Sequence, residues 1–303
     1  MVFAYHNVGA RCLRVLLAHG VDVALVVTHA DNPAENIWFE SVAEVARDYD
    51  LPVATPDDAN TRGFAAQLRA LQPDFFFSFY YRQMLKPALL AIPTRGGYNM
   101  HGSLLPRYRG RVPVNWALIN GERETGATLH RMVERPDAGE IVAQQAVPIL
   151  PDDTAGEVFA KVTLAAELAL DRVLPALLGG TATHLQPDLS VGSYFGGRKP
   201  DDGRIDWKQP AAVVHNLIRA VAPPYPGAFF FIGERRIVVT RSLTSRASRG
   251  PSGRPELHTD GDHLLARCAD GGVLRILSLE VDGEPLAPAA LPARLGQNPI
   301  PLV

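Results

Sequence analysis

Residues 74–80, DFFFSFY, and residues 97–100, GYNM, set the fold class, because both are typical of short buried β-strands. Outward along the chain, Val2 to Tyr5 and Val23 to Thr28 are further short apolar runs. Stretches with helical spacing separate these runs. Strands that alternate with helices predict an α/β fold with a doubly wound, mostly parallel sheet.

A long helix is predicted after two more strand candidates, Thr128 to Val133 and Ile141 to Pro148. Thr154 and Glu157 form a T-x-x-E capping box, which marks the start of a helix. Gly179-Gly180 marks its end. The apolar stripe of this helix comprises Val158, Val162, Ala165, Ala169, Val173 and Leu177. We expect the helix to complete a first domain, residues 1–190.

The pattern changes in the last third of the sequence. Residues 191–203 are rich in Gly, Pro and Asp and predict a linker. Beyond it, short strand candidates lie between Gly-rich turns: Phe229 to Ile232, Arg236 to Thr240, His263 to Arg267 and Val273 to Leu279. Residues 204–303 are therefore expected to form a smaller, OB-like β-barrel domain. Within it the polar segment 242–254 predicts a loop.

The composition is that of an ordinary globular protein, with 303 residues, 47% hydrophobic and 20% charged, and a formal net charge of -2. The chain therefore has no overall positive charge that would indicate nucleic acid as a partner. No apolar run is long enough to span a bilayer. Cys12 and Cys268 have no metal-ligand spacing and fall in different predicted domains. We therefore expect a cytoplasmic protein without a disulfide or a metal.

Asn99 and His101 carry the clearest chemical signal. They lie two positions apart where an apolar strand ends, so an extended chain points both side chains the same way. Ligands of open α/β sheets bind at the carboxyl ends of strands. An amide and an imidazole that face one small volume indicate a catalytic or binding site. Taken singly, Asn99 is better explained by bonding backbone groups at a strand end, and His101 can simply cap a turn. Their spacing reverses that preference for Asn99.

Asp137 is a carboxylate in a tight turn, between Pro136 and Ala138-Gly139. The turn joins the two strand candidates that precede the long helix. Its position in the sequence does not place it near His101. From the residue pattern alone, an ordinary turn residue is the simpler interpretation.

These residues resemble the motifs of the folate-dependent formyltransferases. The match comprises Asn99, the H-x-S-L-L-P run from His101 to Pro106, and the D-x-G of Asp137 to Gly139. The resemblance implies a formyltransferase Rossmann-like domain, with 10-formyltetrahydrofolate as co-substrate and an amine as acceptor. It also implies that Asn99, His101 and Asp137 are the catalytic trio, and that no metal takes part.

Within that family the sequence is most similar to the branch that formylates UDP-4-amino-4-deoxy-L-arabinose in lipid A modification, which confers polymyxin resistance. The segments that carry the similarity are FAYHNVG (3–9), THADNPAEN (28–36), FSFYYRQML (77–85), NMHGSLLPRYRGRVPVNW (99–116), TGATLHRMVERPDAGEIVAQ (125–144) and HNLIRAVAPPYPGA (215–228). The similarity implies a nucleotide-sugar acceptor and no nucleic-acid partner. Two alternative acceptors stay open: methionyl-tRNA, or a different nucleotide-linked amino sugar. Enzymes that use any of these acceptors share the same catalytic trio. The dehydrogenase half that accompanies this branch is not carried over.

The resemblance further implies contacts with the folate. They are Gln83, Met84, Leu85, Arg111, Val133, Glu134, Arg135, Pro136 and Asp137. Backbone groups of these segments are expected to pair with the edge of the pterin ring. For at least one of Arg107, Arg109 and Arg111, a solvated loop edge is the simpler interpretation.

The trio predicts a mechanism. Donors aimed at the formyl oxygen would stabilise the charge that develops when an amine attacks the formyl carbon. Asn99 and a protonated His101 are expected to supply them, with Asp137 raising the pKa of His101. A histidine also exchanges protons near neutral pH. Either His101 or Asp137 can serve as the formal base.

Overall fold

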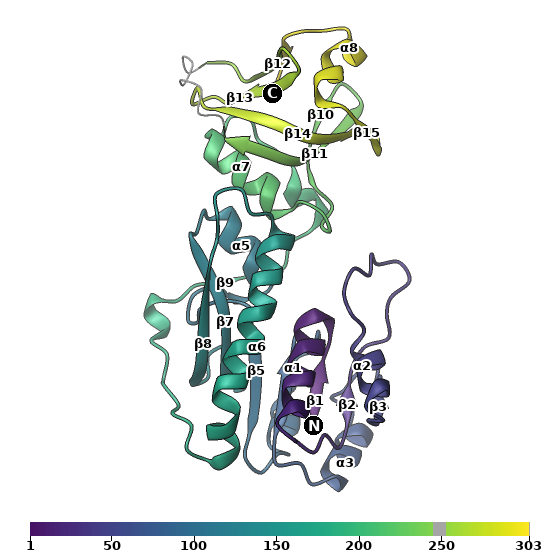
Figure 1. The fold of residues 1–303 in the computed structure, drawn as a ribbon, viewed down its shortest axis with the longest axis vertical. Coiled ribbons are helices and arrows are strands. Elements are labelled where there is room, and N and C mark those ends of the chain that lie inside the picture. The colour runs from purple at the N-terminus through teal and green to yellow at the C-terminus, as the bar shows by residue number, and fades with distance from the viewer. Residues whose placement is uncertain (245–252, 303) are drawn as a thin grey trace. The chain divides into compact units, whose positions relative to one another are not determined.

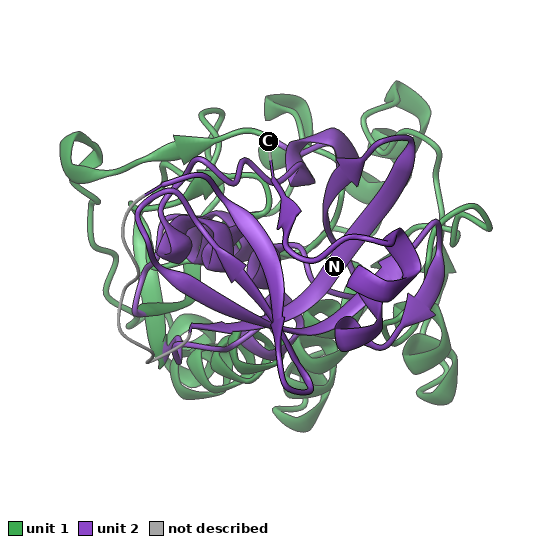
Figure 2. Cartoon of the chain, turned by 90° about the horizontal axis from the view of Figure 1, so that it is seen from above, with its two compact units in different colours: residues 1–113, 124–147, 160–196 green, residues 114–123, 148–159, 197–303 purple. Residues whose placement is uncertain are grey.

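The chain folds into two compact units, which Figure 2 shows in different colours. The computed structural model describes residues 1–244 and 253–302. The first unit comprises residues 1–113, 124–147 and 160–196, and the second comprises residues 114–123, 148–159 and 197–303.

The step between the units at residues 196 and 197 falls inside the predicted linker, 191–203. Two earlier segments, 114–123 and 148–159, cluster with the second unit, which a reading of continuous domains does not anticipate. Of the predicted loop 242–254, residues 245–252 lie outside the described residues.

A seven-stranded sheet forms the centre of the first unit (Figure 1). Across the sheet the strands are β3 (Val53–Ala54), β2 (Val26–Val27), β1 (Val2–Ala4), β4 (Phe76–Phe79), β5 (Gly97–His101), β7 (Glu124–Arg131) and β8 (Ile141–Pro148). Neighbours from β3 to β5 run parallel, and β7 is antiparallel to β5. The predicted doubly wound, mostly parallel α/β fold is therefore confirmed.

Helices follow the strands along the chain, and local capping sets where several of them begin. They are α1 (His6–Ala18), α2 (Val42–Asp48), α3 (Arg62–Ala70), α4 (Pro87–Leu90), α5 (Pro113–Ile119) and α6 (Ala155–Gly179). The predicted capping box opens α6: Thr154 Oγ1 accepts from the Glu157 N–H at 3.4 Å, and the Glu157 carboxylate accepts from the Thr154 N–H at 2.7 Å. The predicted stripe of α6 is buried except for Val173, which is half-buried.

Helices α1 and α6 lie side by side (Figure 1), joined by a bidentate ion pair of Arg11 with Glu167 at 2.7 Å. Because this pair is partly exposed, most of the stability comes from the apolar faces that the helices bury. A separate cluster of buried side chains includes Phe3, Leu68 and Phe76, from β1, α3 and β4. These layers hold the strands rigidly, and the carboxyl end of β5 with them.

A two-stranded parallel sheet of β6 (Arg109–Gly110) and β9 (Tyr194–Phe195) also belongs to the first unit. Strand β9 lies within the sequence range that predicted a linker. Short 3-10 turns flank it, at η1 (Leu189–Val191) and η2 (Pro200–Gly203). This part of the predicted linker is therefore an ordered strand with its own pairing partner.

The second unit contains an antiparallel sheet in the order β10, β11, β14, β13, β12, β16, with β15 paired to β14. Its elements are α7 (Ala211–Ala220), β10 (Ala228–Ile232), β11 (Arg235–Thr244), β12 (Glu256–Asp260), β13 (His263–Arg267), β14 (Val273–Val281), β15 (Glu284–Leu286), η3 (Pro288–Ala290), α8 (Leu291–Leu295) and β16 (Ile300–Pro301). Trp207, fully buried, packs edge-on against Phe230 at its core. The predicted small antiparallel β-domain is confirmed as a half-barrel sheet.

Within residues 1–244 and 253–302, no helix has the length and apolarity to cross a membrane. In the same described ranges, no group of three or more His, Cys, Asp or Glu side chains is arranged to hold a metal ion. Cys12 and Cys268 are both buried and unbridged.

Candidate active site

Strand β5 carries Asn99 and His101 at its carboxyl end. Asn99 pairs in register with His130 of β7, and the Nδ2 atom of Asn99 lies 3.1 Å from Nε2 of His130. The Nε2 atom of His101 lies 2.8 Å from the carbonyl oxygen of Tyr108. His101 and His130 are 7% and 2% exposed, so the fold has to satisfy their ring nitrogens internally.

The hydrogen bonds define which ring nitrogens carry hydrogen. A carbonyl oxygen only accepts, so Nε2 of His101 donates to Tyr108. For the same reason Nδ1 of His130 donates to the Arg131 carbonyl at 3.0 Å. In the neutral rings, Nδ1 of His101 and Nε2 of His130 are then bare, and the latter accepts one N–H of Asn99. Within the described residues the other N–H of Asn99 has no hydrogen-bond partner, which leaves it for a substrate.

Asp137 reaches the same cluster from the hairpin between β7 and β8. Its backbone is left-handed, with a φ of 50°, a region that Asp occupies more readily than most residues. Two positions on, a side chain at Gly139 would collide with the carbonyl of Arg131, so the hairpin closes only with glycine there. The turn after Pro136 is thus a strained one that directs a carboxylate inward.

The Asp137 carboxylate has three neighbours. Its Oδ1 lies 3.6 Å from Nδ1 of His101 and 3.4 Å from Nε2 of His130. Its Oδ2 accepts from the backbone N–H of Gly110 at 2.8 Å. The structure therefore brings the three predicted site residues together, with His130 lying between Asn99 and Asp137.

The pKa of the Asp137 carboxyl lies well below its ordinary value. Burial by itself raises that pKa, since the side chain is only 13% exposed. At the low pH at which this carboxyl titrates, the charge of protonated His101, the contacts with His130 and the hydrogen bond from Gly110 outweigh burial and lower its pKa. Asp137 is accordingly ionised at neutral pH.

The pKa of His101 is also below its ordinary value, which corrects the expectation of a protonated His101. Burial lowers this pKa, and the Asp137 charge and the Tyr108 carbonyl raise it only in part. The 3.6 Å separation from Asp137 is longer than a hydrogen bond. His101 is therefore neutral at neutral pH, with a bare Nδ1 that faces a carboxylate.

The S-L-L-P part of the motif shapes the loop after β5. Ser103 Oγ donates to the carbonyl of Arg107 at 2.7 Å. Thr128 Oγ1 donates to the Ser103 carbonyl at 2.6 Å and accepts from the Leu105 N–H at 3.1 Å. These bonds bind the loop to β7, so that Tyr108 and Gly110 arrive beside His101 and Asp137.

The three residues of the predicted folate segment, Gln83 to Leu85, differ in whether their side chains are free to contact a ligand. The Gln83 amide is occupied within the protein, since Oε1 accepts from the Ala59 N–H at 3.0 Å and Nε2 donates to the Asp57 carbonyl at 2.6 Å. Leu85 is 6% exposed and belongs to the core, whereas Met84 is 59% exposed. The Met84 carbonyl accepts from Nδ2 of Asn60 at 3.0 Å, so the Met84 side chain is the most exposed group that this segment leaves for a ligand.

The second predicted folate segment is more open. Val133, Glu134 and Arg135 are exposed, and Pro136 is half-buried beside Asp137.

The three arginines of the loop differ in burial. Arg107 and Arg111 are exposed, as the solvated-edge interpretation expects, and the backbone N–H of Arg111 donates to Phe195 at 2.9 Å. Arg109 is only 6% exposed, so that interpretation fails for it. In a regular strand, positions two apart share a face, but Tyr108 and Gly110 have positive φ values of 59° and 98°. This irregular backbone buries Arg109 alone, which the charge pattern does not indicate.

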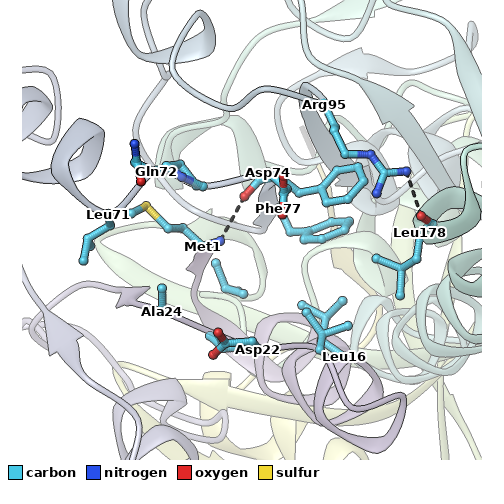
Figure 3. A pocket seen from close by; sticks show the side chains of 15 residues that line it. Met1, Leu16, Asp22, Ala24, Leu71, Gln72, Asp74, Phe77, Arg95 and Leu178 are labelled. Carbon is cyan, nitrogen blue, oxygen red and sulfur yellow. Dashed lines mark hydrogen bonds between the residues drawn. The ribbon is translucent and has the colours of Figure 1, made fainter.

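A cavity of about 270 Å³ lies elsewhere in the first unit, and Figure 3 shows its lining. Its walls include Val2, Phe77 and Arg95, which lie at or just before the amino ends of β1, β4 and β5. Arg95 is held there by a hydrogen bond of 2.7 Å to the Leu178 carbonyl (Figure 3). Since Asn99 and His101 lie at the opposite end of β5, this cavity is not part of the candidate active site.

His130 is the site residue that sequence reasoning missed. It lies in a strand that the sequence predicted, but the local sequence does not reveal which other strand pairs with that strand. A histidine within a buried apolar run was the available signal. The antiparallel register, which sets Asn99 opposite His130, was needed to interpret it.

Comparison with known families agrees with this geometry. Residues 10–174 match the formyl transferase family, and residues 198–293 match the formyl transferase C-terminal domain. The chain therefore belongs to the formyl transferase family, and the predicted enzyme class is confirmed.

Solved structures share the fold at low sequence identity. The N-formyltransferase from Helicobacter canadensis, in complex with folinic acid and dTDP-3-aminofucose, is 20% identical, with a TM-score of 0.73 over 91% of this chain and 97% of its own. The sugar 3N-formyltransferase WlaRD, studied with dTDP and 5-N-formyl-THF, is 20% identical, with a TM-score of 0.70 over 91% and 95%. A sugar N-formyltransferase from Shewanella is 18% identical, with a TM-score of 0.62 over 80% and 97%.

Proposed function

We propose that this protein transfers the formyl group of 10-formyltetrahydrofolate to the amine of a nucleotide-linked amino sugar. The observation that carries the proposal is the convergence of Asn99, His101 and Asp137 in one buried cluster, in a chain of the formyl transferase family. The folate and dTDP-sugar ligands of the Helicobacter canadensis structure support the substrate classes.

Asn99 is the donor to the formyl oxygen in this proposal. One of its amide hydrogens is engaged by His130, which fixes the plane of the amide. The other hydrogen then points in a defined direction without a partner in the described part of the protein. A fixed donor stabilises the negative charge that develops on the formyl oxygen, with no reorganisation at the moment of reaction.

His101 and Asp137 together take up the proton of the attacking amine. As the amine nitrogen bonds to the formyl carbon, the nitrogen becomes acidic and has to lose a proton. The bare Nδ1 of His101 and the Asp137 carboxylate face each other at 3.6 Å, and a proton placed between them is held by both. His101 then returns a proton to the folate nitrogen as the bond between that nitrogen and the formyl carbon breaks. Atoms balance as one formamide and one tetrahydrofolate.

The folate lies against Met84 and the segment from Val133 to Asp137 in this proposal. Met84 and Val133 offer exposed apolar surface, at 59% and 40% exposure. Backbone groups of the two segments pair with the edge of the pterin. Arg111, exposed on the loop of β6, contacts an anionic part of a substrate.

For the acceptor we assign the 4-amine of UDP-4-amino-4-deoxy-L-arabinose, which places the reaction in lipid A modification. The sequence segments 3–9, 77–85 and 99–116 support this choice over other nucleotide sugars. A net charge of -2 disfavours a tRNA acceptor, which calls for a basic face.

The test is a formyl-transfer assay with 10-formyltetrahydrofolate and three acceptors, in which release of tetrahydrofolate is followed by absorbance. UDP-4-amino-4-deoxy-L-arabinose should be turned over fastest, a dTDP-linked 3-amino sugar more slowly, and methionyl initiator tRNA not at all. Turnover of the tRNA alone would overturn the proposed acceptor class. Absence of turnover with every amine would overturn the proposed reaction.

A further inference from the structure

Residues 192–196 lie outside both family matches, which cover residues 10–174 and 198–293. They nevertheless pair along the loop that carries Tyr108 and Gly110. The N–H of Arg109 donates to the Ser193 carbonyl at 3.0 Å, and the N–H of Arg111 donates to the Phe195 carbonyl at 2.9 Å. We call residues 192–196 the strap.

Ser193 makes the central contacts of the strap. Its hydroxyl accepts from the Tyr108 N–H at 2.8 Å, and its own N–H donates to the Pro106 carbonyl at 3.2 Å. The ring of Phe195 stacks on that of Tyr108, with centroids 5.3 Å apart. Tyr108 is thus fixed by its N–H and by its ring, which leaves its carbonyl to accept from His101.

The strap also fits closely against the loop at two glycines. A side chain at Gly110 would collide with the Phe195 carbonyl, and Gly110 supplies the N–H that binds Asp137. A Cβ atom at Gly192 would lie 2.6 Å from the Pro106 carbonyl oxygen. Such close packing transmits a change in the strap to the loop, because neither backbone has room to move aside.

We propose that the strap is a positioning element of the active site, in which Ser193 orients His101 through Tyr108 and the β6–β9 pairing orients Asp137 through Gly110. The effect of the strap on catalysis rests on the proposed function. Its effect on the orientation of His101 does not. Loosening the strap turns the Tyr108 carbonyl away from Nε2 of His101, and the imidazole loses the bond that fixes its tautomer.

Two glycines of the strap give a matched pair of variants. Gly192→Ala introduces the contact with Pro106, whereas a Cβ atom at Gly196 meets nothing within 4 Å. We expect Gly192→Ala to lower kcat about tenfold or more with little change in either KM, and Gly196→Ala to behave as wild type. The ¹⁵N NMR signals of the His101 imidazole should change in Gly192→Ala only, a readout that does not depend on the reaction.

A less disruptive variant keeps the test decisive if Gly192→Ala does not fold. Ser193→Ala removes one hydrogen bond, and we expect kcat to fall about three- to tenfold. The groups that face His101 are Asp137, His130 and the Tyr108 carbonyl, and that carbonyl raises the pKa of His101. The acid limb of the kcat profile should therefore move to lower pH. Ser190→Ala, which removes an exposed contact to Asp188, is the control.

Wild-type kcat, pH profile and His101 signals in both Gly192→Ala and Ser193→Ala would overturn the role of the strap. A wild-type protein without formyl-transfer activity would instead overturn the proposed function, and the NMR comparison would still decide on the strap.

Arg109 is a buried residue of the same loop whose Nε atom has no partner. It is 6% exposed, and its Nε has no hydrogen-bond partner. Among the described residues no carboxylate lies within ion-pair distance of its guanidinium. Arg219 is equally buried in the second unit, yet its Nε and NH2 donate to Asn216 and its NH1 to the Asp153 carbonyl. The fold satisfies the Nε of Arg219 and leaves the buried Nε of Arg109 without a partner, which is costly unless a ligand completes it.

Arg109 also has a fixed place beside the site. It lies between Tyr108, which binds His101, and Gly110, which binds Asp137. We infer that its guanidinium binds an oxyanion of a substrate, which deepens the proposed function. The planar fork of arginine matches a phosphate or a carboxylate. The two sources are the diphosphate of the acceptor and the glutamate carboxylates of the folate.

The test is Arg109→Met, with Arg107→Met of the same loop as the exposed control. Calorimetric titration with UDP and with 5-formyltetrahydrofolate should show at least a tenfold loss of affinity for one of the two in Arg109→Met, and the affected ligand identifies the source. Because an unpaired buried charge is removed, the thermal midpoint without ligand should not fall. Unchanged affinity for both ligands would overturn the inference, and a wild-type protein that binds neither would count against the proposed function itself.

Discussion

His101 in the first unit and His215 in the second are both buried beside a carboxylate, yet their ring nitrogens have different partners. His215 has both ring nitrogens engaged: Nδ1 lies 2.9 Å from the Ser242 hydroxyl, and Nε2 lies 3.1 Å from the Pro151 carbonyl. Its acidic neighbour, Asp152, is largely exposed at 47%. His101 has Nε2 engaged by Tyr108, but its Nδ1 faces the buried Asp137 across 3.6 Å.

The difference separates a structural histidine from one that is prepared for chemistry. Burial lowers the pKa of both, so a pKa shift alone does not tell them apart. What distinguishes His101 is an unsatisfied ring nitrogen opposite an ionised carboxylate. Such an arrangement is costly to stability and useful for accepting a proton, as expected of functional sites.

The largest expected effect comes from His101→Asn. Loss of the proton acceptor and donor should lower kcat by roughly 10³. The protein should stay folded, because one buried imidazole that is not fully bonded is replaced by a smaller amide. His263→Asn, at an exposed position of β13, should keep wild-type kcat. Steady-state kinetics on both variants provides the measurement. Near-normal turnover in His101→Asn would mean that His101, like His215, has only a structural role.

Asn99→Ala comes next. Removing the donor to the formyl oxygen should lower kcat by about 10², the usual effect of one such donor. The dissociation constant of the folate should change little, because the contact strengthens only as charge develops. A loss confined to folate affinity, with kcat intact, would assign Asn99 to binding instead.

His130→Leu sharpens the comparison within the site. His130 holds the Asn99 amide without facing the substrate in the proposed mechanism. Loss of this hydrogen bond should lower kcat about three- to tenfold, less than Asn99→Ala does. If the two losses were independent, the double variant would show their product. We expect the double variant to match Asn99→Ala, since His130 acts through Asn99.

His215→Leu should affect stability and leave the chemistry alone. The Ser242 hydroxyl and the Pro151 carbonyl lose their partner, which costs about 1–3 kcal/mol in the free energy of unfolding. Turnover per folded molecule should stay at the wild-type level. Urea denaturation and kinetics on the same preparation measure both quantities.

The pH dependence of that stability has a defined sign. The pKa of His215 in the folded protein lies below the unfolded value of about 6.5, because burial disfavours its charged form. Below about pH 6.5 the unfolded chain binds a proton that the folded one does not, so the wild-type free energy of unfolding falls as the pH is lowered. His215→Leu should show a shallower fall between pH 7.5 and 5.5, and an identical slope would contradict the assignment.

Much of the fold was accessible from the sequence because its signals are local. The capping box of Thr154 and Glu157 depends on residues three apart, and the structure forms both of its bonds. The spacing of Asn99 and His101 likewise follows from the geometry of a single strand. Strand ends were less accessible: the run Val23 to Thr28 is a strand only at Val26–Val27, where its neighbours supply backbone partners.

What the sequence left open depends on contacts between distant segments. His130 acquires its role from the register of β7 against β5, and the strap from pairing of residues more than eighty positions apart in the chain. The direction of the His101 pKa shift was predicted wrongly for a related reason. The attraction to Asp137 was visible in the motif, but the depth of burial, which outweighs it, is a property of the folded chain.

The central claim, that Asp137 acts in the chemistry and not only in its turn, is tested most directly by Asp137→Asn. Asparagine keeps the size of the side chain, tolerates the left-handed backbone at φ 50°, and can still accept from the Gly110 N–H. It removes the charge opposite Nδ1 of His101. We predict that kcat falls by about 10² or more while the dissociation constant of the folate changes less than about twofold, the signature of an interaction made mainly in the transition state. An Asp137→Asn enzyme with near-normal kcat would contradict the account.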